Sequence, residues 1–222
     1  TNGFRSTIVA GTSSSCAIVE NDSILCWGDN TNGVLGNDLA QSSWPVPVNY
    51  SGFTPRVLSH GHSHVCMILD NGSIYCWGDN VYGQLGDGGD IQHSSGQANS
   101  SATPVQVLIP EGTNATDIAA GGWFTCAVLD NGDAYCWGDW EYGQLGHGGG
   151  ETAGGSSVPL QVNLPSGLNA TSISAGYHHA CATTEDGNAY CWGLGSGTGR
   201  LGDGLTYDFT EGEAEFTTSP VQ

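Results

Sequence analysis

Two cysteines ten residues apart recur four times along this chain of 222 residues, with a turn sequence inside each pair. In the second pair, Asp70-Asn71-Gly72 lies between Cys66 and Cys76, and Asn-Gly favours a tight β-hairpin turn because both residues tolerate a positive φ. The flanking runs, residues 65–69 and 73–77, are short and β-prone. Folding the hairpin about this turn sets the cysteines opposite each other, with Cα atoms about 4.5 Å apart. A disulfide can span that distance, so we predict one inside each hairpin.

The predicted disulfides are Cys16–Cys26, Cys66–Cys76, Cys126–Cys136 and Cys181–Cys191. Each second cysteine begins a Cys-Trp-Gly sequence, and each unit closes with Gly-x-Leu-Gly. The units span residues 11–36, 61–86, 121–146 and 176–202. Self-similarity at a spacing of roughly 50–60 residues is typical of propellers and solenoids.

Every repeat supplies four short strand candidates separated by turn residues, as an all-β fold requires. In the third repeat they are residues 104–109, 116–120, 125–129 and 134–137. We therefore predict a β-propeller of four repeats, each a four-stranded antiparallel blade. The repeat units are approximately residues 1–44, 45–103, 104–157 and 158–218, and residues 219–222 form a closing strand.

The two ends of the chain are out of phase with the repeat. The first unit lacks a leading strand, and the matching strand appears unattached at the C-terminus. Unpaired strand edges invite pairing with another chain. We predict that the chain is a segment of a larger propeller or that another chain completes it. In a head-to-tail ring or filament, the paired edges would be Ser219, Pro220, Val221 and Gln222 of one copy and Thr7, Ile8, Val9 and Ala10 of the next.

The charge of the chain excludes several partners. There is no lysine, and Arg5, Arg56 and Arg200 are the only strong cations against 22 acidic residues, for a formal net charge of −19. Such a surface cannot neutralise phosphates, so we expect neither nucleic-acid binding nor docking on anionic lipid. The sequence shows no signal peptide or hydrophobic span, which indicates a processed product or part of something longer.

The cysteines also indicate a compartment. Zinc sites usually space cysteines about two to four residues apart, and that pattern is absent, although reduced thiol pairs are an alternative to disulfides. Disulfides favour an oxidising, extracytoplasmic setting, so we predict a secreted protein. Six N-x-S/T sequons agree with secretion. Asn114 and Asn169 are the favoured glycosylation sites because Asn-Ala-Thr recurs there, ahead of Asn49, Asn99, Asn21 and Asn71.

Four short sequences recur along the chain, and they are Gly-x-x-His, Asp-Asn-Gly, Tyr-Cys-Trp-Gly-Asp and Gly-Gln-Leu-Gly. Together they resemble the repeat of the regulator of chromosome condensation family, over essentially the whole chain. The resemblance implies a β-propeller, usually of seven blades. The family's histidine falls at His64 and His179, whereas Ser14 and Phe124 replace it elsewhere, and Leu194 replaces an Asp. With four repeats, either blades are missing from this segment, or four blades close alone, or several chains complete one another.

For function, the resemblance implies only a propeller scaffold that can host many activities. Founding nuclear members exchange nucleotide on a small GTPase and bind chromatin, tasks for which an acidic, cysteine-paired chain is a poor candidate. Secreted members are closer in setting and include binding platforms and inhibitors of β-lactamase.

Two regular sets of side chains have structural interpretations. A tryptophan at a fixed place in every blade, at Trp27, Trp77, Trp137 and Trp192, indicates packing between blades instead of a ligand cage. Asp29, Asp79 and Asp139 follow Trp-Gly, where a carboxylate commonly caps turn amides.

Metal signals are weak. Asp87 and Asp90 form a candidate calcium site, because hard cations take several oxygens from a flexible loop. His60, His62 and His64 alternate along one segment, and His178 adjoins His179, which suits a transition metal. His64, however, occupies the position that the resemblance marks as structural. We predict no resident metal and no other cofactor, with calcium kept as the alternative.

No catalytic constellation is assembled in the sequence, so we predict a non-catalytic protein. The leading hypothesis is an extracellular structural propeller that self-assembles through open strand edges. The second is a monomeric binding module that grips another protein or a glycan with its long loops, with Tyr82, Trp140 and Tyr142 as partner anchors. A third is a carbohydrate-active enzyme that uses paired rim carboxylates.

Overall fold

The structure is a computed structural model that describes residues 7–89, 91, 100–149, 154–195, 199–204 and 216–222. These residues form four antiparallel sheets of four strands each and one short 3-10 turn, η1 (Thr31–Gly33). The predicted all-β fold of four bladed repeats is confirmed. Within the described ranges, no helix has the length and hydropathy needed to cross a bilayer.

The strands of each sheet follow one another in chain order. Blade 1 contains β1 (Ile8–Ala10), β2 (Ser14–Ile18), β3 (Ile24–Gly28) and β4 (Ser42–Pro47). Blade 2 contains β5 (Pro55–His60), β6 (His64–Leu69), β7 (Ile74–Gly78) and β8 (Ser101–Gln106). Blade 3 contains β9 (Ala115–Ala120), β10 (Phe124–Leu129), β11 (Ala134–Gly138) and β12 (Ser156–Gln161). Blade 4 contains β13 (Ala170–Ala175), β14 (His179–Thr184), β15 (Ala189–Leu194) and β16 (Phe216–Val221).

Each sheet of the structure ends one strand later in the chain than the repeat unit predicted from the sequence. Residues 104–109, expected to lead the third unit, overlap β8, which is the last strand of blade 2. Likewise, the expected unattached C-terminal strand belongs to β16, which pairs with β15 through Cys191 and Val221. The expectation is corrected because the fourth strand of each blade returns, after a long loop, to pair with the third strand of the same blade. Each blade is therefore complete in itself.

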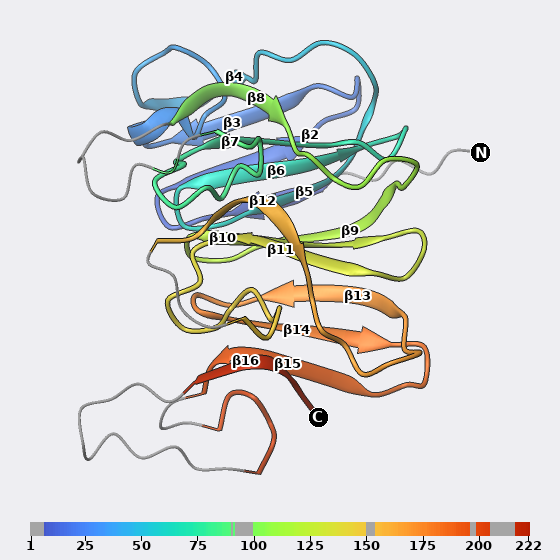
Figure 1. The fold of residues 1–222 in the computed structure, drawn as a ribbon. Helices are drawn as coiled ribbons and strands as arrows, with labels where there is room; N and C mark the ends of the chain where they lie inside the picture. Colours follow the sequence, from blue (N-terminus) through green and yellow to red (C-terminus); the bar gives the residue numbers. More distant parts are fainter. Residues whose placement is uncertain (1–6, 90, 92–99, 150–153, 196–198, 205–215) are drawn as a thin grey trace, which may run out of the picture.

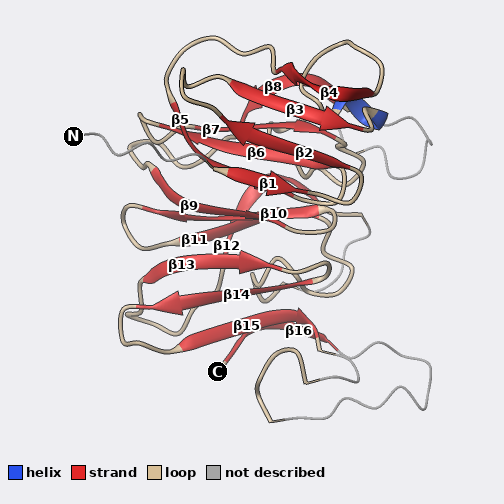
Figure 2. Cartoon of the chain, turned by 180° about the vertical axis from the view of Figure 1, so that it is seen from behind, coloured by secondary structure: helices blue, strands red, loops and turns tan. Residues whose placement is uncertain are grey.

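The four blades are stacked in chain order, with blade 1 and blade 4 at opposite ends of the molecule (Figures 1 and 2). First strands of consecutive blades contact each other, β1 with β5, β5 with β9 and β9 with β13, so they form the inner side of the stack. Blades meet through their faces and not through the edges of their sheets. Within the part of the chain that the structure describes, one face of blade 1 and one face of blade 4 have no neighbouring blade.

The hydrophobic core is divided among the contacts between blades. Each of its three clusters combines residues of two consecutive blades. In the cluster between blades 2 and 3, Ile118 of β9 packs with Ile68 and with the Cys66–Cys76 disulfide. Apolar residues at alternate strand positions supply such a face because side chains alternate across a sheet. Packing between blades is thus the main source of burial.

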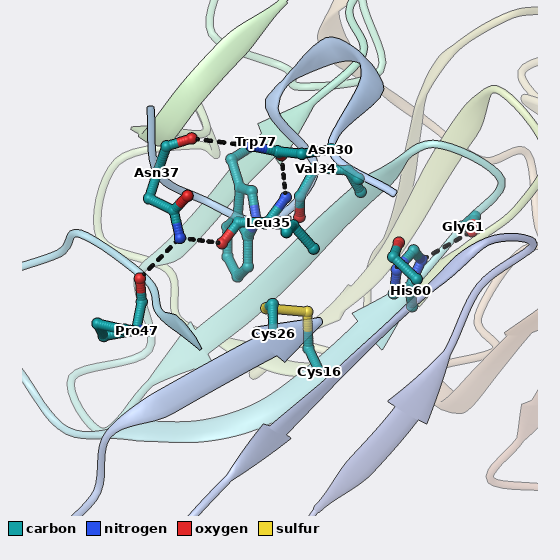
Figure 3. Close-up of a disulfide and its surroundings, with 11 residues drawn as sticks. Cys16, Cys26, Asn30, Val34, Leu35, Asn37, Pro47, His60, Gly61 and Trp77 are labelled. Carbon is teal, nitrogen blue, oxygen red and sulfur yellow. Dashed lines mark hydrogen bonds between the residues drawn. A yellow bond between two sulfur atoms is a disulfide. The ribbon is translucent and has the colours of Figure 1, made fainter. Parts of the chain in front are cut away.

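A tryptophan is buried in each of these contacts between blades. Trp77, Trp137 and Trp192 are fully buried, and each indole Nε1 donates a hydrogen bond of 2.9 Å to a carbonyl of the preceding blade, at Val34, Gln84 and Gln144 respectively. Figure 3 shows Trp77 beside Val34 and Leu35 and close to the Cys16–Cys26 disulfide. Packing between blades, predicted for this set, is confirmed for these three. Trp27 of blade 1 is only half-buried.

All four predicted disulfides are present. Their Cα atoms lie 4.0 to 4.1 Å apart, and the paired cysteines are opposite each other in the register of each hairpin. The cysteines of blades 1 to 3 are fully buried, because the following blade covers them. Cys181 and Cys191 of blade 4 are partly exposed.

Candidate binding face

Aromatic side chains gather where two kinds of loop meet on one side of the stack. One kind joins the first and second strands of a blade, and the other begins after the third strand with the sequence that ends in Gly-x-Leu-Gly. The side chains are His62, Tyr82, Trp123, Tyr142, Tyr177 and His178, here called the aromatic face. Blades 2, 3 and 4 all contribute to it.

Trp123 is at the centre of the aromatic face. Its ring centroid lies 5.0 Å from that of Tyr177, 5.3 Å from His62 and 6.0 Å from Tyr82. The contacts with Tyr177 and His62 are edge-to-face, the arrangement that aromatic quadrupoles favour. Tyr177 is 47% exposed, and Trp123, His62 and Tyr82 are half-buried. The rings support one another and still offer surface to a ligand.

His178 extends the aromatic face toward blade 4. Its ring lies 4.6 Å from Tyr177 and 4.8 Å from Tyr142. Trp140 does not join this set; it stacks on His147 with ring centroids 5.7 Å apart and an interplanar angle of 6°. Of the three predicted anchors, Tyr82 and Tyr142 therefore share one surface, while the described ring contact of Trp140 is to its own loop.

The sequence carries a signal for four residues of the aromatic face that were not predicted as anchors. The glycine directly after the first strand is followed within two residues by His62, Trp123, Tyr177 and His178 in blades 2 to 4, and by Thr12 and Ser13 in blade 1. Exposed positions that vary between repeats are where a repeat protein carries recognition. The rule holds for these two-residue turns as well as for the long loops.

A hollow of about 230 Å³ adjoins the aromatic face on its inner side. The turns after the first strands of all four blades line it, with His62 and Tyr177 among the lining side chains. Much of the remaining lining is glycine or alanine, which leaves backbone groups accessible. A ligand held by the aromatic rings has room to insert a small group here.

Carboxylates lie behind the tyrosines. Burial raises the pKa of Asp79 and of Asp139. Burial, together with these and neighbouring acidic groups, raises the pKa of the Tyr82 and Tyr142 hydroxyls. Burial lowers the pKa of His178, so its imidazole is neutral at neutral pH. The aromatic face is therefore neutral to acidic.

Short turns fix the tyrosines in place. The Tyr82 amide donates to Oε1 of Gln84 at 2.9 Å, and the Tyr142 amide donates to Oε1 of Gln144 at 2.8 Å. The aspartates after Trp-Gly cap the same turns, as predicted. Their Oδ1 atoms accept from backbone amides two residues on: Asp29 from Thr31 at 3.2 Å, Asp79 from Val81 at 3.3 Å and Asp139 from Glu141 at 3.1 Å.

The histidines have separate environments. His64 is fully buried, and its Nε2 lies 2.9 Å from the Thr125 hydroxyl. Because that hydroxyl donates its proton to the Gln84 carbonyl at 3.0 Å, it accepts a hydrogen bond from His64 Nε2. His60 contacts Ser14 through Nε2 at 2.9 Å and the Gly61 carbonyl through Nδ1 at 2.8 Å. Among the described residues, no three His, Cys, Asp or Glu side chains are placed to share a metal ion.

The remaining predicted sites are placed in part. Asp90 and Asn99 lie outside the described residues, while Asp87 accepts from the Gly89 amide at 3.2 Å. Asn21, Asn49, Asn71, Asn114 and Asn169 are exposed. Asn114 and Asn169 also have a structural role, because each Nδ2 donates to a carboxylate in the hairpin turn of its own blade, that of Asp130 at 2.8 Å and that of Glu185 at 3.1 Å. Glycosylation stays a prediction.

Four blades joined face to face, with aromatic loop residues on one side, define a propeller-type repeat scaffold. The chain belongs to the regulator of chromosome condensation (RCC1) repeat family. One model of this repeat matches residues 71–128 and 131–183, and a second matches residues 6–34, 115–144 and 170–197.

The ultraviolet-B receptor UVR8 of Arabidopsis thaliana is 30% identical over 200 residues, which is 89% of this chain and 43% of that protein. Among solved structures, Prp20p of Saccharomyces cerevisiae matches all of this chain and 51% of its own at a TM-score of 0.80 and 21% identity. Human WBSCR16 matches all of this chain and 53% of its own at a TM-score of 0.77 and 19% identity. The chain thus spans about half of these relatives.

Proposed function

We propose that this chain is an extracellular, non-catalytic binding module that holds a partner protein on its aromatic face. The ring cluster around Trp123 carries the proposal. Tryptophan and tyrosine supply large, stiff contact area at low entropic cost and dominate binding energy at protein interfaces. Half-buried rings that are supported by one another are already organised for such a contact.

Charge indicates the chemistry of the partner. The chain carries a formal net charge of −19, and Glu141 is exposed beside Tyr142. A partner segment with arginine or lysine gains from this field, and its cations can stack on Trp123 and Tyr177. We therefore propose a partner with a basic, solvent-exposed segment.

Relatives support a protein-binding role. The structure of Prp20p was described together with its binding to Gsp1p and histones, and UVR8 is named a receptor. Propellers host many activities, so the role here depends on the side chains of the aromatic face and not on the fold alone.

Four disulfides and five exposed sequon asparagines support an extracellular home. The intact mass of native material, taken after alkylation with and without reductant and glycosidase, tests this directly. We expect eight cysteines to become alkylated only after reduction. Eight thiols that react in native material would remove the argument for secretion.

The binding proposal is tested with an arginine-rich peptide of basic, extended character as probe. We expect calorimetric binding that weakens with salt and falls at least about tenfold in Trp123→Ser and Tyr177→Ser. Trp44→Ser is the matched control, because Trp44 is 79% exposed on β4 of blade 1 and distant in sequence from the aromatic face. Binding to a glycan array instead of the peptide would replace the protein partner by a carbohydrate. Equal losses in all three variants would contradict the assigned face.

Self-association is a second candidate, because the sequence predicts pairing between the strand edges of two copies. In this role the chain is a structural subunit that grows head to tail into a ring or a filament. Pairing of β16 with β1 of another copy, as expected from the sequence, joins strands at different places in their blades, the fourth and the first. The blades of this chain join by their faces, which favours a different mode of contact.

A further inference from the structure

Three connections lead from the fourth strand of one blade to the first strand of the next, and all three start in the same way. Each begins with a buried valine whose amide donates to the third strand of the blade that it leaves, at 2.8 to 3.0 Å. The valines are Val48, Val107 and Val162. Two residues later, an apolar or aromatic side chain packs into the joint, meaning the contact between two consecutive blades. These side chains are Tyr50, Ile109 and Leu164.

The connection between blades 1 and 2 then differs from the other two. Its next residue is Ser51, where the others have Pro110 and Pro165. The carbonyl of each proline accepts a hydrogen bond from the amide three residues later, at 3.2 to 3.3 Å, which closes a β-turn. No such bond is made by Ser51 within the described ranges.

The end of the same connection is also anchored differently. In the other two connections, the amides of Ala115 and Ala170 donate to a glycine carbonyl in the hairpin turn of the preceding blade, at 2.9 and 2.8 Å. Pro55 stands at this position in the first connection, and proline has no amide proton to donate. The Tyr50 hydroxyl donates instead, to the Asp22 carbonyl in the hairpin turn of blade 1, at 2.6 Å. One side chain thus replaces a backbone anchor.

A hollow of about 500 Å³ lies beside this connection, in the joint between blades 1 and 2. Residues of the connection and of blade 2 line it: Asn49, Tyr50, Ser51, Met67, Leu69, Tyr75 and Pro104. Serine at position 51 occupies less space than the proline of the other connections. The volume of the hollow is in the range of small-molecule sites.

The floor of the hollow is apolar and aromatic. Met67 and Leu69 are buried side chains of β6. The Tyr50 hydroxyl is bound at the hairpin turn, and the Tyr75 hydroxyl donates to Oε1 of Gln106 at 3.5 Å. Neither of these acceptors lines the hollow, so the two tyrosines present ring carbons to it.

The rim of the hollow is polar. Asn49 and Ser51 are exposed, and among the residues that the structure describes neither side chain has a hydrogen-bond partner. An amide and a hydroxyl can each donate and accept hydrogen bonds. The formal net charge of −19 disfavours an anionic ligand. A fitting ligand therefore is uncharged, with an apolar ring face and several hydroxyl groups at its edge.

We propose that this hollow binds the pyranose ring of a neutral sugar. The C–H face of the ring packs on Tyr50 and Tyr75, and its hydroxyl groups bond to Asn49 and Ser51. A planar aromatic compound fits less well, because it offers fewer hydrogen-bonding groups to the rim. The site is separate from the aromatic face, since it lies toward the Leu69 end of β6 and the aromatic turn precedes the other end. It goes beyond the proposed protein binding and does not depend on it.

The test uses the whole chain, made in a host that adds no N-glycans, so that Asn49 keeps its amide. The probes are methyl glycosides of glucose, galactose, mannose and N-acetylglucosamine, with phenol as the planar ligand. Saturation-transfer difference NMR and tyrosine fluorescence report binding. We expect at least one glycoside to bind with a dissociation constant on the order of 1 mM. Tighter binding of the matching oligosaccharide assigns the site to a glycan chain, and equal binding assigns it to a free sugar.

Two variants copy residues from the other connections of this chain. Ser51→Pro introduces the residue found at Pro110 and reduces the space in the hollow. Asn49→Leu copies Leu108 and removes the amide from the rim. Each variant should weaken glycoside binding at least about tenfold. Urea unfolding of each variant confirms that it is folded before binding is measured.

A third variant has a matched control in the next joint. Tyr75→Ala removes a ring from the hollow and should also weaken glycoside binding at least about tenfold. Tyr135→Ala is the control, because Tyr135 packs into the joint between blades 2 and 3 as Tyr75 packs into the joint between blades 1 and 2. We expect Tyr135→Ala to bind as wild type does.

The outcomes decide between the site and its alternatives. Glycoside binding that Ser51→Pro and Tyr75→Ala weaken and Tyr135→Ala preserves supports the proposal. Equal losses in Tyr75→Ala and Tyr135→Ala would place the sugar elsewhere. Phenol binding without glycoside binding would replace the sugar by a planar ligand, and no binding of any probe would also overturn the proposal. Peptide binding at the aromatic face is measured separately, so each proposal can fail while the other stands.

Discussion

The contact between blades 2 and 3 and the outer face of blade 1 have similar residues in the same register but opposite exposure. Ile118 is 5% exposed and Ile8 is 70% exposed; Trp137 is fully buried and Trp27 is half-buried. The difference lies in the neighbour and not in the blade's own sequence. Stability in this molecule therefore depends on nearest-neighbour contacts, as in other repeat proteins.

The tryptophans give the largest expected contrast. Trp137→Ala removes a fully buried indole and its hydrogen bond to Gln84, which should cost about 3–5 kcal/mol of the free energy of unfolding. Trp27→Ala, at the open face, should cost about 1 kcal/mol or less. Urea unfolding of both variants, measured at a concentration where the chain is monomeric, checks the contrast. Equal losses would show that the tryptophan stabilises its own blade instead of the joint.

The disulfides give the next contrast. Each closes a loop with a sequence separation of 10 and should contribute about 3 kcal/mol through the unfolded chain. Removing the buried Cys66–Cys76 pair with a double alanine substitution should cost more than removing Cys181–Cys191, because it also leaves a cavity. In native material, mild reductant should open the partly exposed Cys181–Cys191 bond first. Peptide mapping after alkylation gives the order of reduction, and simultaneous opening of all four bonds would contradict it.

The histidines give a pH-dependent contrast. Burial, together with His60 and His62, lowers the pKa of His64 to about 3. Between pH 6.5 and pH 3 the unfolded chain binds a proton that the folded chain does not, so this contribution to stability is complete above pH 6.5 and is lost as the pH falls. The loss at pH 5 should be about 2 kcal/mol.

His64→Phe, which copies Phe124 of blade 3, should flatten this slope of the free energy of unfolding between pH 7 and pH 5. His179→Phe in blade 4 should flatten it less, because His179 is only half-buried. Urea titrations across this range provide the measurement. A wild-type slope that His64→Phe leaves unchanged would assign the pH dependence to other groups.

The smallest expected effect is at the open face of blade 4. Thr183→Ile places on this face the residue type found at Ile18 and Ile68, and because no described neighbour buries it, the free energy of unfolding should change by about 0.5 kcal/mol or less. Thr183→Ser is the matched control, because it keeps the hydroxyl that contacts Thr171 and Ser172. Urea unfolding compares the two free energies of unfolding. A gain of more than about 1 kcal/mol in Thr183→Ile alone would show that another surface covers this face.

The hairpins and disulfides were predictable because their information is local. The turn at Asn71 fixes the register over five residues on either side, and Cys66 and Cys76 follow from it. The assignment of the fourth strand to its own blade was not predictable, because that strand pairs with the third strand across a long loop. In blade 4, the polar sequence before β16 hides this connection. The aromatic face was missed in part because Trp123 and Tyr177 are far apart in sequence and meet only through stacking of blades.

The contacts between blades also fix how the aromatic face is arranged. Blades 2, 3 and 4 each bring aromatic residues to it, whereas blade 1 carries Thr12 and Ser13 at the corresponding turn. A head-to-tail row of copies would carry one aromatic patch per copy, separated by a polar interval of one blade. A polymeric partner with basic groups at that interval would bind by avidity, so that many weak contacts act together and release becomes slow.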